Sequence, residues 1–277
     1  MNVPDPAIAA SADSASGDAS PLASRIAAAG LDWIVPRWPA PSRVRAFVTT
    51  RNGGVSAGPC ASLDLGTVPP SDAARDELRA VAENRRRVQA FLPSAPAWLA
   101  QVHGADVAVV ASQRAASPPR ADAAVTREAG VVLAVRVADC MPVLFADSAG
   151  EVVGIAHAGW RGLAAGVLEN TVAAMRCAPE GIVAWLGPAI GPSAFEVGAD
   201  VRDAFVNPDP RAAAAFVAGR PGKWHADLEA LARMRLARAG VASIHGGGMC
   251  TASDPQRFFS FRRDRATGRM AAFVWLA

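Results

Sequence analysis

The sequence has few of the features that would place a protein in a membrane or outside the cell. It contains four cysteines in 277 residues, too few and too widely spaced for a disulfide scaffold, so we expect reduced thiols. No uninterrupted apolar stretch reaches the length that a membrane-spanning helix requires. The first residues also lack the basic segment and apolar core of a secretory signal. These absences favour a cytoplasmic protein with no membrane partner.

Basic charge is present but is not concentrated in one place. The formal net charge is +3, from 28 lysines and arginines against 25 acidic residues. A short run, Arg85 to Arg87, lies in a polar stretch from 72 to 91 whose pattern predicts a helix with a solvated face. Binding to duplex nucleic acid would call for a basic patch or stripe. We therefore expect no nucleic-acid partner.

Apolar residues make up 51% of the chain, enough for one large core. Strand and helix patterns interleave, which predicts an α+β fold: a single domain with mixed β-sheets flanked by helices. Residues 1–28 are rich in Ala, Ser, Asp and Pro and predict a disordered leader, so the catalytic domain is expected to span 29–277. A helix is predicted over 163–176. Two segments at the C-terminal end, 258–262 and 269–276, flank a turn and predict a β-hairpin.

Three potential metal ligands stand where predicted strands end. His103, Cys140 and His157 lie in the segments QVHGAD, VADCMP and IAHAGWRG. Two imidazoles and one thiolate can supply three ligands to a tetrahedral metal and leave the fourth position to water or substrate, as in a catalytic zinc site. Each of these residues alone would more often be an ordinary core or loop residue. Together they favour a catalytic metal site with zinc as the expected ion.

Polar residues beside these ligands are candidates for catalysis. Asp139 precedes Cys140 and could act as a general acid or base, although an aspartate in such a turn is commonly a cap. Arg161 follows His157 at a predicted helix start, where unpaired amides favour a phosphate or a developing oxyanion. Cys250 is a candidate for substrate binding, because it follows three glycines and precedes a Thr-x-Ser-Asp-Pro turn, which could hold its thiol near a cleft. Ordinary packing is an equal alternative for Cys250.

A second anion-binding segment is predicted after the strand at 44–50. Arg51, Asn52 and Ser56 surround two glycines that permit a tight turn, and such a turn can cradle an anion. An arginine beside it would add charge-assisted hydrogen bonds. We expect these residues to bind substrate, and the alternative for Arg51 is a structural ion pair.

Other chemistries use the same residue types. Two histidines and a cysteine are also the equatorial ligands of a blue-copper site, and Met141 adjoins Cys140, although neighbouring strand residues point to opposite faces. A multinuclear copper cluster would need many more imidazoles than the four histidines present. Cys140 could instead be the nucleophile of a metal-free hydrolase, with a histidine as its base. Copper is therefore the alternative to zinc, and a cysteine hydrolase the alternative to a metalloenzyme.

Seven segments together resemble the YfiH family, whose members were historically labelled polyphenol oxidase or laccase-domain proteins. The resemblance covers residues from about 40 to the end and follows the order of the family's motifs. It rests on TTRNGGVS, QVHGADV, ADAAVT, VADCMPVLFAD, IAHAGWRGLAAGVLENTV, WLGPAIGPSAFEVG and CTASDPQRFFSFRRDRATGRMAAFVWL.

The resemblance implies a zinc-bound purine nucleoside enzyme, with a nucleoside and phosphate as its small-molecule partners. Similar members are described as phosphorolysing adenosine, inosine, guanosine and methylthioadenosine and as deaminating adenosine. The metal is implied at the positions that match His103, Cys140 and His157. A link of some members to cell-wall precursor control implies a further alternative, amide hydrolysis of a peptidoglycan intermediate. The family often has an aromatic residue near Cys60 and near Cys250, but this chain has no tyrosine. The sequence therefore does not indicate which residue would stack on the purine base.

Overall fold

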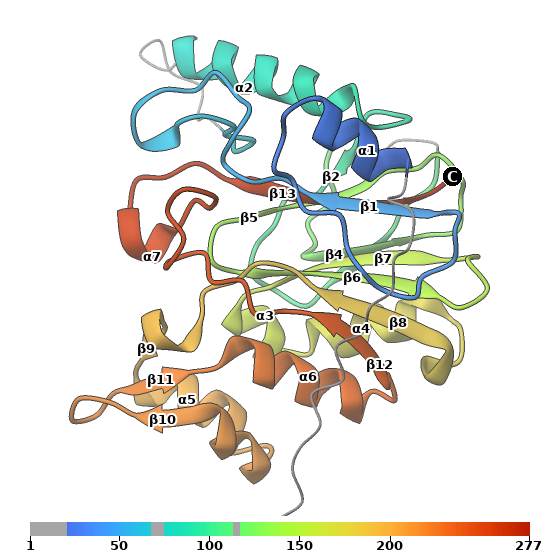
Figure 1. Ribbon diagram of the computed structural model, residues 1–277. Coiled ribbons are helices and arrows are strands. Elements are labelled where there is room, and N and C mark those ends of the chain that lie inside the picture. Colours follow the sequence, from blue (N-terminus) through green and yellow to red (C-terminus); the bar gives the residue numbers. More distant parts are fainter. Residues whose placement is uncertain (1–20, 68–74, 113–116) are drawn as a thin grey trace, which may run out of the picture.

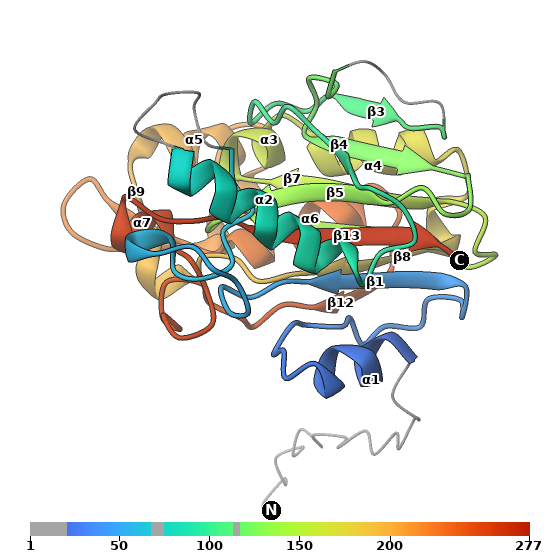
Figure 2. The same cartoon turned by 90° about the horizontal axis from the view of Figure 1, so that it is seen from above.

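The computed structural model describes residues 21–67, 75–112 and 117–277. Within these ranges two β-sheets pack face to face, and helices cover the outer face of each sheet (Figure 1). The view from above shows the same layers, with α2 lying over the strands of the smaller sheet (Figure 2). None of the helices in these ranges has the length and apolar character needed to cross a membrane. The α+β fold with mixed sheets in a single domain is confirmed.

The smaller sheet of this pair has four strands in the described ranges. Strands β1 and β5 lie on either side of β13 and both pair antiparallel with it, whereas the edge strand β2 pairs parallel with β5. In spatial order the strands are β1 (Val44–Val48), β13 (Met270–Leu276), β5 (Leu133–Val137) and β2 (Ala97–Trp98).

The larger sheet has six strands in the described ranges. Its centre is antiparallel, β8 with β6, β6 with β7 and β7 with β4, and each edge strand is added in parallel. In spatial order the strands are β12 (Ser243–Gly246), β8 (Ile182–Leu186), β6 (Met141–Asp147), β7 (Val153–Ala158), β4 (Ala123–Thr126) and β3 (Val107–Val109).

Helices and a small third sheet complete the described fold. The helices are α1 (Pro21–Ala28), α2 (Arg75–Gln89), α3 (Trp160–Ala164), α4 (Val167–Met175), α5 (Ala199–Val206), α6 (Leu228–Arg238) and α7 (Phe261–Asp264). The third sheet joins β10 (Phe216–Ala218), β11 (Trp224–Ala226) and β9 (Glu196–Val197). Short 3₁₀ turns lie at Gly58–Cys60, Pro179–Gly181, Pro192–Ala194 and Pro210–Ala215.

The apolar runs of the sequence are continuous because both faces of each main sheet are buried. In β6, Val143 and Phe145 belong to the core between the sheet and the helices α3 to α6, whereas Leu144 belongs to the core between the two sheets. Successive strand residues point to opposite faces, so both alternate sets must be apolar. The same alternation places Phe273 of β13 against α1 and α2 while its neighbour Val274 faces the other sheet.

The predicted leader differs from the structure at its end. Residues 1–20 lie outside the described residues, but 21–28 form α1. Leu22 and Ile26 are spaced four residues apart, share one helix face, and are buried against Trp33 and Phe47. The composition suggested disorder because these two apolar side chains are surrounded by small and polar residues.

Two further local predictions were wrong. The expected C-terminal hairpin does not form, because β13 pairs with β1 and β5, and Ser260 instead caps the short helix α7 by accepting a hydrogen bond from the amide of Arg263. The expected helix over 163–176 is divided into α3 and α4. Gly166 lies between them at φ +93°, a left-handed conformation that glycine adopts without strain.

The fold brings one end of each main sheet to the same place. Pro142 at the start of β6 is paired with His157 near the end of β7, so Cys140 and His157 lie at one edge of the larger sheet. The chain reaches that edge from β5 of the smaller sheet through Ala138 and Asp139. His103 lies in the connection between β2 and β3, which belong to different sheets. The seam between the sheets therefore carries all three predicted ligands.

Candidate metal centre and its pocket

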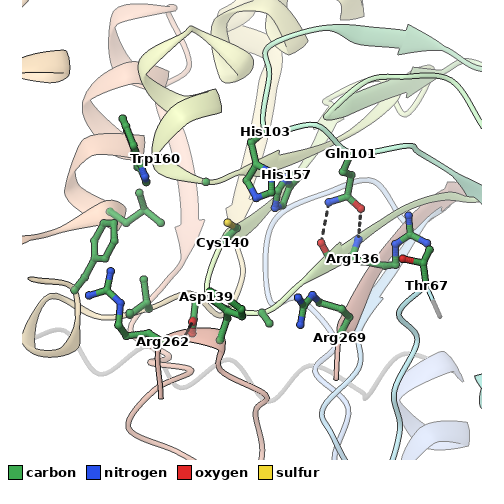
Figure 3. A pocket seen from close by; sticks show the side chains of 16 residues that line it. Thr67, Gln101, His103, Arg136, Asp139, Cys140, His157, Trp160, Arg262 and Arg269 are labelled. Atoms are coloured by element: carbon green, nitrogen blue, oxygen red, sulfur yellow. Dashed lines mark hydrogen bonds between the residues drawn. The ribbon is translucent and has the colours of Figure 1, made fainter. Parts of the chain in front are cut away.

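His103, Cys140 and His157 converge although they are far apart in the sequence. One potential ligand atom from each of them lies within 4.8 Å of those of the other two. The two imidazole rings meet edge to face with centroids 4.9 Å apart, and the sulfur points toward them (Figure 3). His103 is exposed, Cys140 is half-buried and His157 is buried. One side of the cluster is thus open to solvent.

Asp122 fixes two of the three side chains and was missed in the sequence analysis. Its carboxylate is fully buried and accepts hydrogen bonds from the amides of Val102, His103 and Gly104 at 2.7–3.0 Å. The carboxylate also lies 2.8 Å from His157 Nδ1. An ionised carboxylate only accepts, so Nδ1 carries the proton and Nε2 is free to face the cluster. The available signal was the position of Asp122 in the segment ADAAVT, immediately before a strand.

The His103 turn has a strained backbone that Asp122 supports. His103 has φ +61°, which is uncommon for a residue other than glycine. Three consecutive amides, those of residues 102–104, point at one carboxylate in this turn. The hydrogen bonds to Asp122 offset the cost of this conformation and aim the imidazole at the cluster.

The electrostatics of the cluster favour a bound cation. Burial opposes ionisation of the Cys140 thiol, but the charge of His157 and hydrogen bonds from both imidazoles lower its pKa to about 6. Burial likewise disfavours the charged form of His157, but the Cys140 thiolate and the hydrogen bond with Asp122 raise its pKa to about 9. In the absence of metal, the site therefore holds a thiolate beside an imidazolium. Replacing the imidazolium proton with a metal would leave both side chains as good ligands.

The donor set fits a metal of the zinc type. Tetrahedral zinc takes nitrogen ligands at about 2.0–2.1 Å and sulfur at about 2.3 Å, which small side-chain movements could reach from this spacing. Met141, a candidate axial ligand for copper, is buried in the core behind the sheet and does not line the pocket that contains Cys140. Among the described residues, His103, Cys140 and His157 form the one cluster of three or more metal-binding side chains. A site with several copper ions has no counterpart in that part of the chain.

The cluster opens into a cavity of about 510 Å³ with two different ends. Trp160 and Arg262 lie on one side of Cys140, whereas Gln101, Arg136, Arg269 and Thr67 lie on the other (Figure 3). The Arg262 guanidinium sits 5.3 Å from the centroid of the Phe195 ring, so Phe195 belongs to the Trp160 side. Leu228, Ile190, Phe261, Ala138 and Gly159 also line the cavity. A planar apolar group and an anion would thus each find a suitable wall.

Asp139 lies in the pocket wall with both carboxylate oxygens already bonded. Oδ1 accepts from the Thr251 hydroxyl at 2.6 Å, and Oδ2 accepts from the Arg262 amide at 2.7 Å. Its backbone has φ +83°, in the turn that leads from β5 into β6. Asp139 therefore holds the loops behind the pocket together through both of its oxygens.

Arg161 does not line the pocket. It lies in α3, exposed, with its guanidinium 4.4 Å from the ring centroid of the neighbouring Trp160. Trp160, which does line the pocket, takes the position that the sequence analysis gave to Arg161. With five residues α3 is also too short to provide a strong helix dipole.

Arg51, Asn52 and Ser56 do not line the pocket either. The Arg51 guanidinium donates to the carbonyls of Ala61 and Pro255, both at 2.9 Å. The Asn52 amide donates to Asp32 and to the carbonyl of Gln256, and the Ser56 hydroxyl accepts from Asn84. These polar groups connect loops instead of surrounding a cavity.

Cys250 lines a separate cavity of about 150 Å³. Burial raises the pKa of its thiol. Hydrogen bonds from Ser253 and from the amides of Gly191, Ser253 and Ala252 together lower that pKa by more, so the net shift is downward. The Gly191 amide lies 3.2 Å from the sulfur. Ile190 lines both cavities, so Cys250 supports the wall of the larger pocket from behind.

Comparison with known proteins shows the family of this chain. A family model described as "Multi-copper polyphenol oxidoreductase laccase" matches residues 45–277. The chain belongs to this family. The family is the YfiH family that the sequence resembles: "Purine nucleoside phosphorylase YfiH" of Escherichia coli is 53% identical over 245 residues, which are 88% of this chain and 98% of that protein.

Other relatives give the same result. "Purine nucleoside phosphorylase PA4543" of Pseudomonas aeruginosa is 52% identical over 245 residues, 88% of this chain and 98% of that protein. The crystal structure of Neisseria meningitidis protein NMB0706 superposes with a TM-score of 0.82 at 50% identity, covering 88% of this chain and 99% of that one. The fold of this YfiH family member is therefore that of a solved relative.

Two glycines in the HAGWRG segment of this YfiH family member let its backbone pass close to the metal ligands. A Cβ on Gly159 would lie 2.7 Å from the Cys140 sulfur, and a Cβ on Gly162 would lie 2.7 Å from the carbonyl oxygen of Gly104. Glycine at these positions lets the chain after His157 pass close to the other two ligands.

Gly159→Ala is expected to weaken metal binding roughly tenfold, the lower end of the effect of changing a residue that supports a ligand. Gly159 has φ −74° and ψ 164°, which alanine also adopts, so the effect should come from contact with the sulfur and not from backbone strain. Competition with a chromogenic chelator measures the affinity. Gly181→Ala, whose Cβ would meet only the Ser148 hydroxyl at 3.2 Å, is the control and should bind metal normally. Equal affinities in both variants would contradict the contact.

Proposed function

We propose that the protein is a zinc-dependent purine nucleoside phosphorylase that also deaminates adenosine. The observation that carries the proposal is the three-residue cluster open on one side to a pocket of about 510 Å³. Relatives that are 52–53% identical over 88% of this chain carry the name purine nucleoside phosphorylase, which supports the same reaction here. The proposed substrates are adenosine, inosine, guanosine and methylthioadenosine, with phosphate.

The proposed zinc ligands are His103, Cys140 and His157. A zinc ion held there would supply Lewis acidity and could lower the pKa of a bound water. The ring of Trp160 and the ring of Phe195 offer apolar faces for the purine at one side of the cluster. Asp122 keeps the proton on His157 Nδ1, which holds that ring in one orientation throughout the reaction.

The two proposed reactions differ in the group that attacks. In phosphorolysis a phosphate oxygen forms a bond to ribose C1′ while the bond to the purine nitrogen breaks, and the purine leaves with the electron pair and takes up a proton. In deamination water replaces the purine amino group and ammonia leaves. The second reaction needs no phosphate, so the presence or absence of phosphate separates the two products.

Product analysis by mass spectrometry tests the proposal. Zinc-loaded protein is incubated with adenosine, with and without phosphate, beside a His103→Ala variant. Adenine and ribose 1-phosphate should form only with phosphate, inosine should form without it, and His103→Ala should form neither. Zinc-loaded protein that turns over none of the four nucleosides would overturn the proposal.

A second experiment, on copper-loaded protein, tests the alternative suggested by the family description. Copper-loaded protein is assayed for oxidation of a phenol and for the visible absorption of a thiolate–copper bond. If both signals are found and the zinc-loaded protein forms no nucleoside product, the protein is a phenol oxidase and the phosphorylase proposal fails.

A further inference from the structure

The end of the pocket beside Gln101 is positively charged, and no carboxylate of the described residues forms an ion pair with its arginines. Three arginines line the pocket, Arg136, Arg262 and Arg269, and the one carboxylate in its wall is Asp139. The two oxygens of Asp139 accept hydrogen bonds from the Thr251 hydroxyl and from the Arg262 amide. In the described ranges, none of these three guanidinium groups has a carboxylate oxygen within 4.0 Å, whereas other arginines do, such as Arg235 with Glu169. Unpaired cations in a concave site indicate an anionic ligand.

Arg136 and Arg269 have guanidinium nitrogens left for such a ligand. In the described part of the chain, Arg136 uses Nη2 for the carbonyl of Leu99 at 2.8 Å, and Nε and Nη1 make no hydrogen bond. Arg269 uses Nη1 for the carbonyls of Thr267 and Gly268, both at 3.0 Å, and its Nε and Nη2 make none. Each arginine is therefore anchored through one nitrogen and still offers two more. Such an anchored fork matches the oxygens of a phosphoryl group.

The electrostatics of this end agree with the geometry. Burial lowers the pKa of Arg136, and the neighbouring charges of Arg85 and Arg269 lower it further, while Asp64 opposes them. The arginines thus repel one another across a half-buried space. A dianion between Arg136 and Arg269 would relieve that repulsion.

The position of the pair relative to the metal ligands suits phosphorolysis. Gln101 exchanges two hydrogen bonds of 2.9 Å with the backbone of Arg136 and stands two residues before His103. Arg136 stands four residues before Cys140, so their Cα atoms are at most ~14 Å apart. The apolar side with Trp160 lies across the metal ligands from the arginines (Figure 3). A purine on that side and a phosphate on the arginine side would place the ribose between them, open to attack on the face away from the base.

We propose that Arg136 and Arg269 form the binding site for the phosphoryl group used in the reaction, in place of Arg51 and Arg161. The proposal rests on the proposed function for its assignment to inorganic phosphate as attacking group. The same chemistry would also bind the diphosphate of a nucleotide-linked substrate, and the two sources are separated by the test.

Arg269→Gln is the main test, because the hydrogen bonds that the Arg269 side chain makes to described residues go to the neighbouring carbonyls. Loss of a charge-assisted contact should raise the KM for phosphate roughly 10- to 100-fold in phosphorolysis of inosine. Phosphate-independent deamination of adenosine and zinc content should change less than about twofold, since neither uses the lost contact. Arg269→Lys, which keeps the charge but not the fork, should fall between wild type and Arg269→Gln. Arg211→Gln, a surface arginine paired with Asp209, is the control and should match wild type.

Direct binding separates this proposal from the proposed function. The affinity of the zinc-loaded full-length chain for inorganic phosphate and for uridine diphosphate is measured by titration calorimetry. One outcome would separate the two proposals: no nucleoside is phosphorolysed, but either probe binds to the wild type and binds at least tenfold more weakly to Arg269→Gln. The anion site would then stand, and the phosphorylase proposal would fail. Much tighter binding of uridine diphosphate than of phosphate would assign the site to a phosphoryl group of the substrate. An unchanged KM for phosphate in an active Arg269→Gln variant, or unchanged binding of both probes, overturns the anion site.

Discussion

Cys140→Ser is expected to lose the metal and all nucleoside turnover together. Serine preserves the size of the side chain, but its hydroxyl remains protonated at neutral pH and is a poor ligand for zinc. The loss of affinity should exceed the ~10- to 100-fold effect of residues that only support a ligand. Metal content by mass spectrometry and adenosine phosphorolysis, measured on the same sample, give the two readouts.

The combination of readouts distinguishes the metal site from a metal-free cysteine hydrolase. If Cys140 were only a nucleophile, the serine variant would lose activity without any change in metal content. Cys177→Ser is the matched control, because Cys177 is a half-buried free cysteine that does not line the pocket. That variant should keep full metal content and activity. An inactive Cys140→Ser protein with one zinc per chain would contradict the proposed centre.

Much of the fold could be predicted because local pattern and burial agree. The apolar run over 182–186 forms β8, and the helical spacing of apolar residues over 199–206 and 228–238 forms α5 and α6. These segments have either continuous apolar side chains or a helical spacing of them. The hairpin and the helix over 163–176 failed because pairing partners far along the chain, and the left-handed Gly166, decide those regions.

The convergence of His103, Cys140 and His157 could also be predicted, because strand ends beside glycines commonly position side chains in a site. The residues that form the wall of the pocket could not be predicted from the sequence. Arg136 stands inside an apolar strand, and Arg269 lies just before another, so neither belongs to a polar motif. They meet only because β13 pairs with β5. Arg51 and Arg161 attracted attention through their motifs, yet the first connects loops and the second lies on the surface of α3.

Asp122 carries the second large expected effect, since it supports two of the three ligands. In Asp122→Asn, one carboxylate oxygen becomes an NH₂ group, which cannot accept a hydrogen bond. The oxygen replaced is either Oδ2, which accepts from the amides of Val102 and Gly104, or Oδ1, which accepts from the His103 amide and His157 Nδ1. We expect metal affinity to fall roughly 10- to 100-fold. A buried donor left without an acceptor should also cost about 1–3 kcal/mol of folding stability in the metal-free protein. Chelator competition and urea unfolding measure the two effects.

Asp147→Ala shows whether the effect on metal is more than general destabilisation. Asp147 is buried and accepts hydrogen bonds from the amides of Glu151 and Val152 at 2.7–2.8 Å, but it lies at the other end of β6 from Cys140. Its alanine variant leaves these two amides without their acceptor, so it should lose stability and keep the metal affinity of the wild type. If both variants lost the same stability and neither lost metal affinity, Asp122 would only hold the His103 turn. If Asp122→Asn alone releases the metal, the hydrogen bonds to the turn and to His157 define the shape of the centre, because loss of packing is common to both variants.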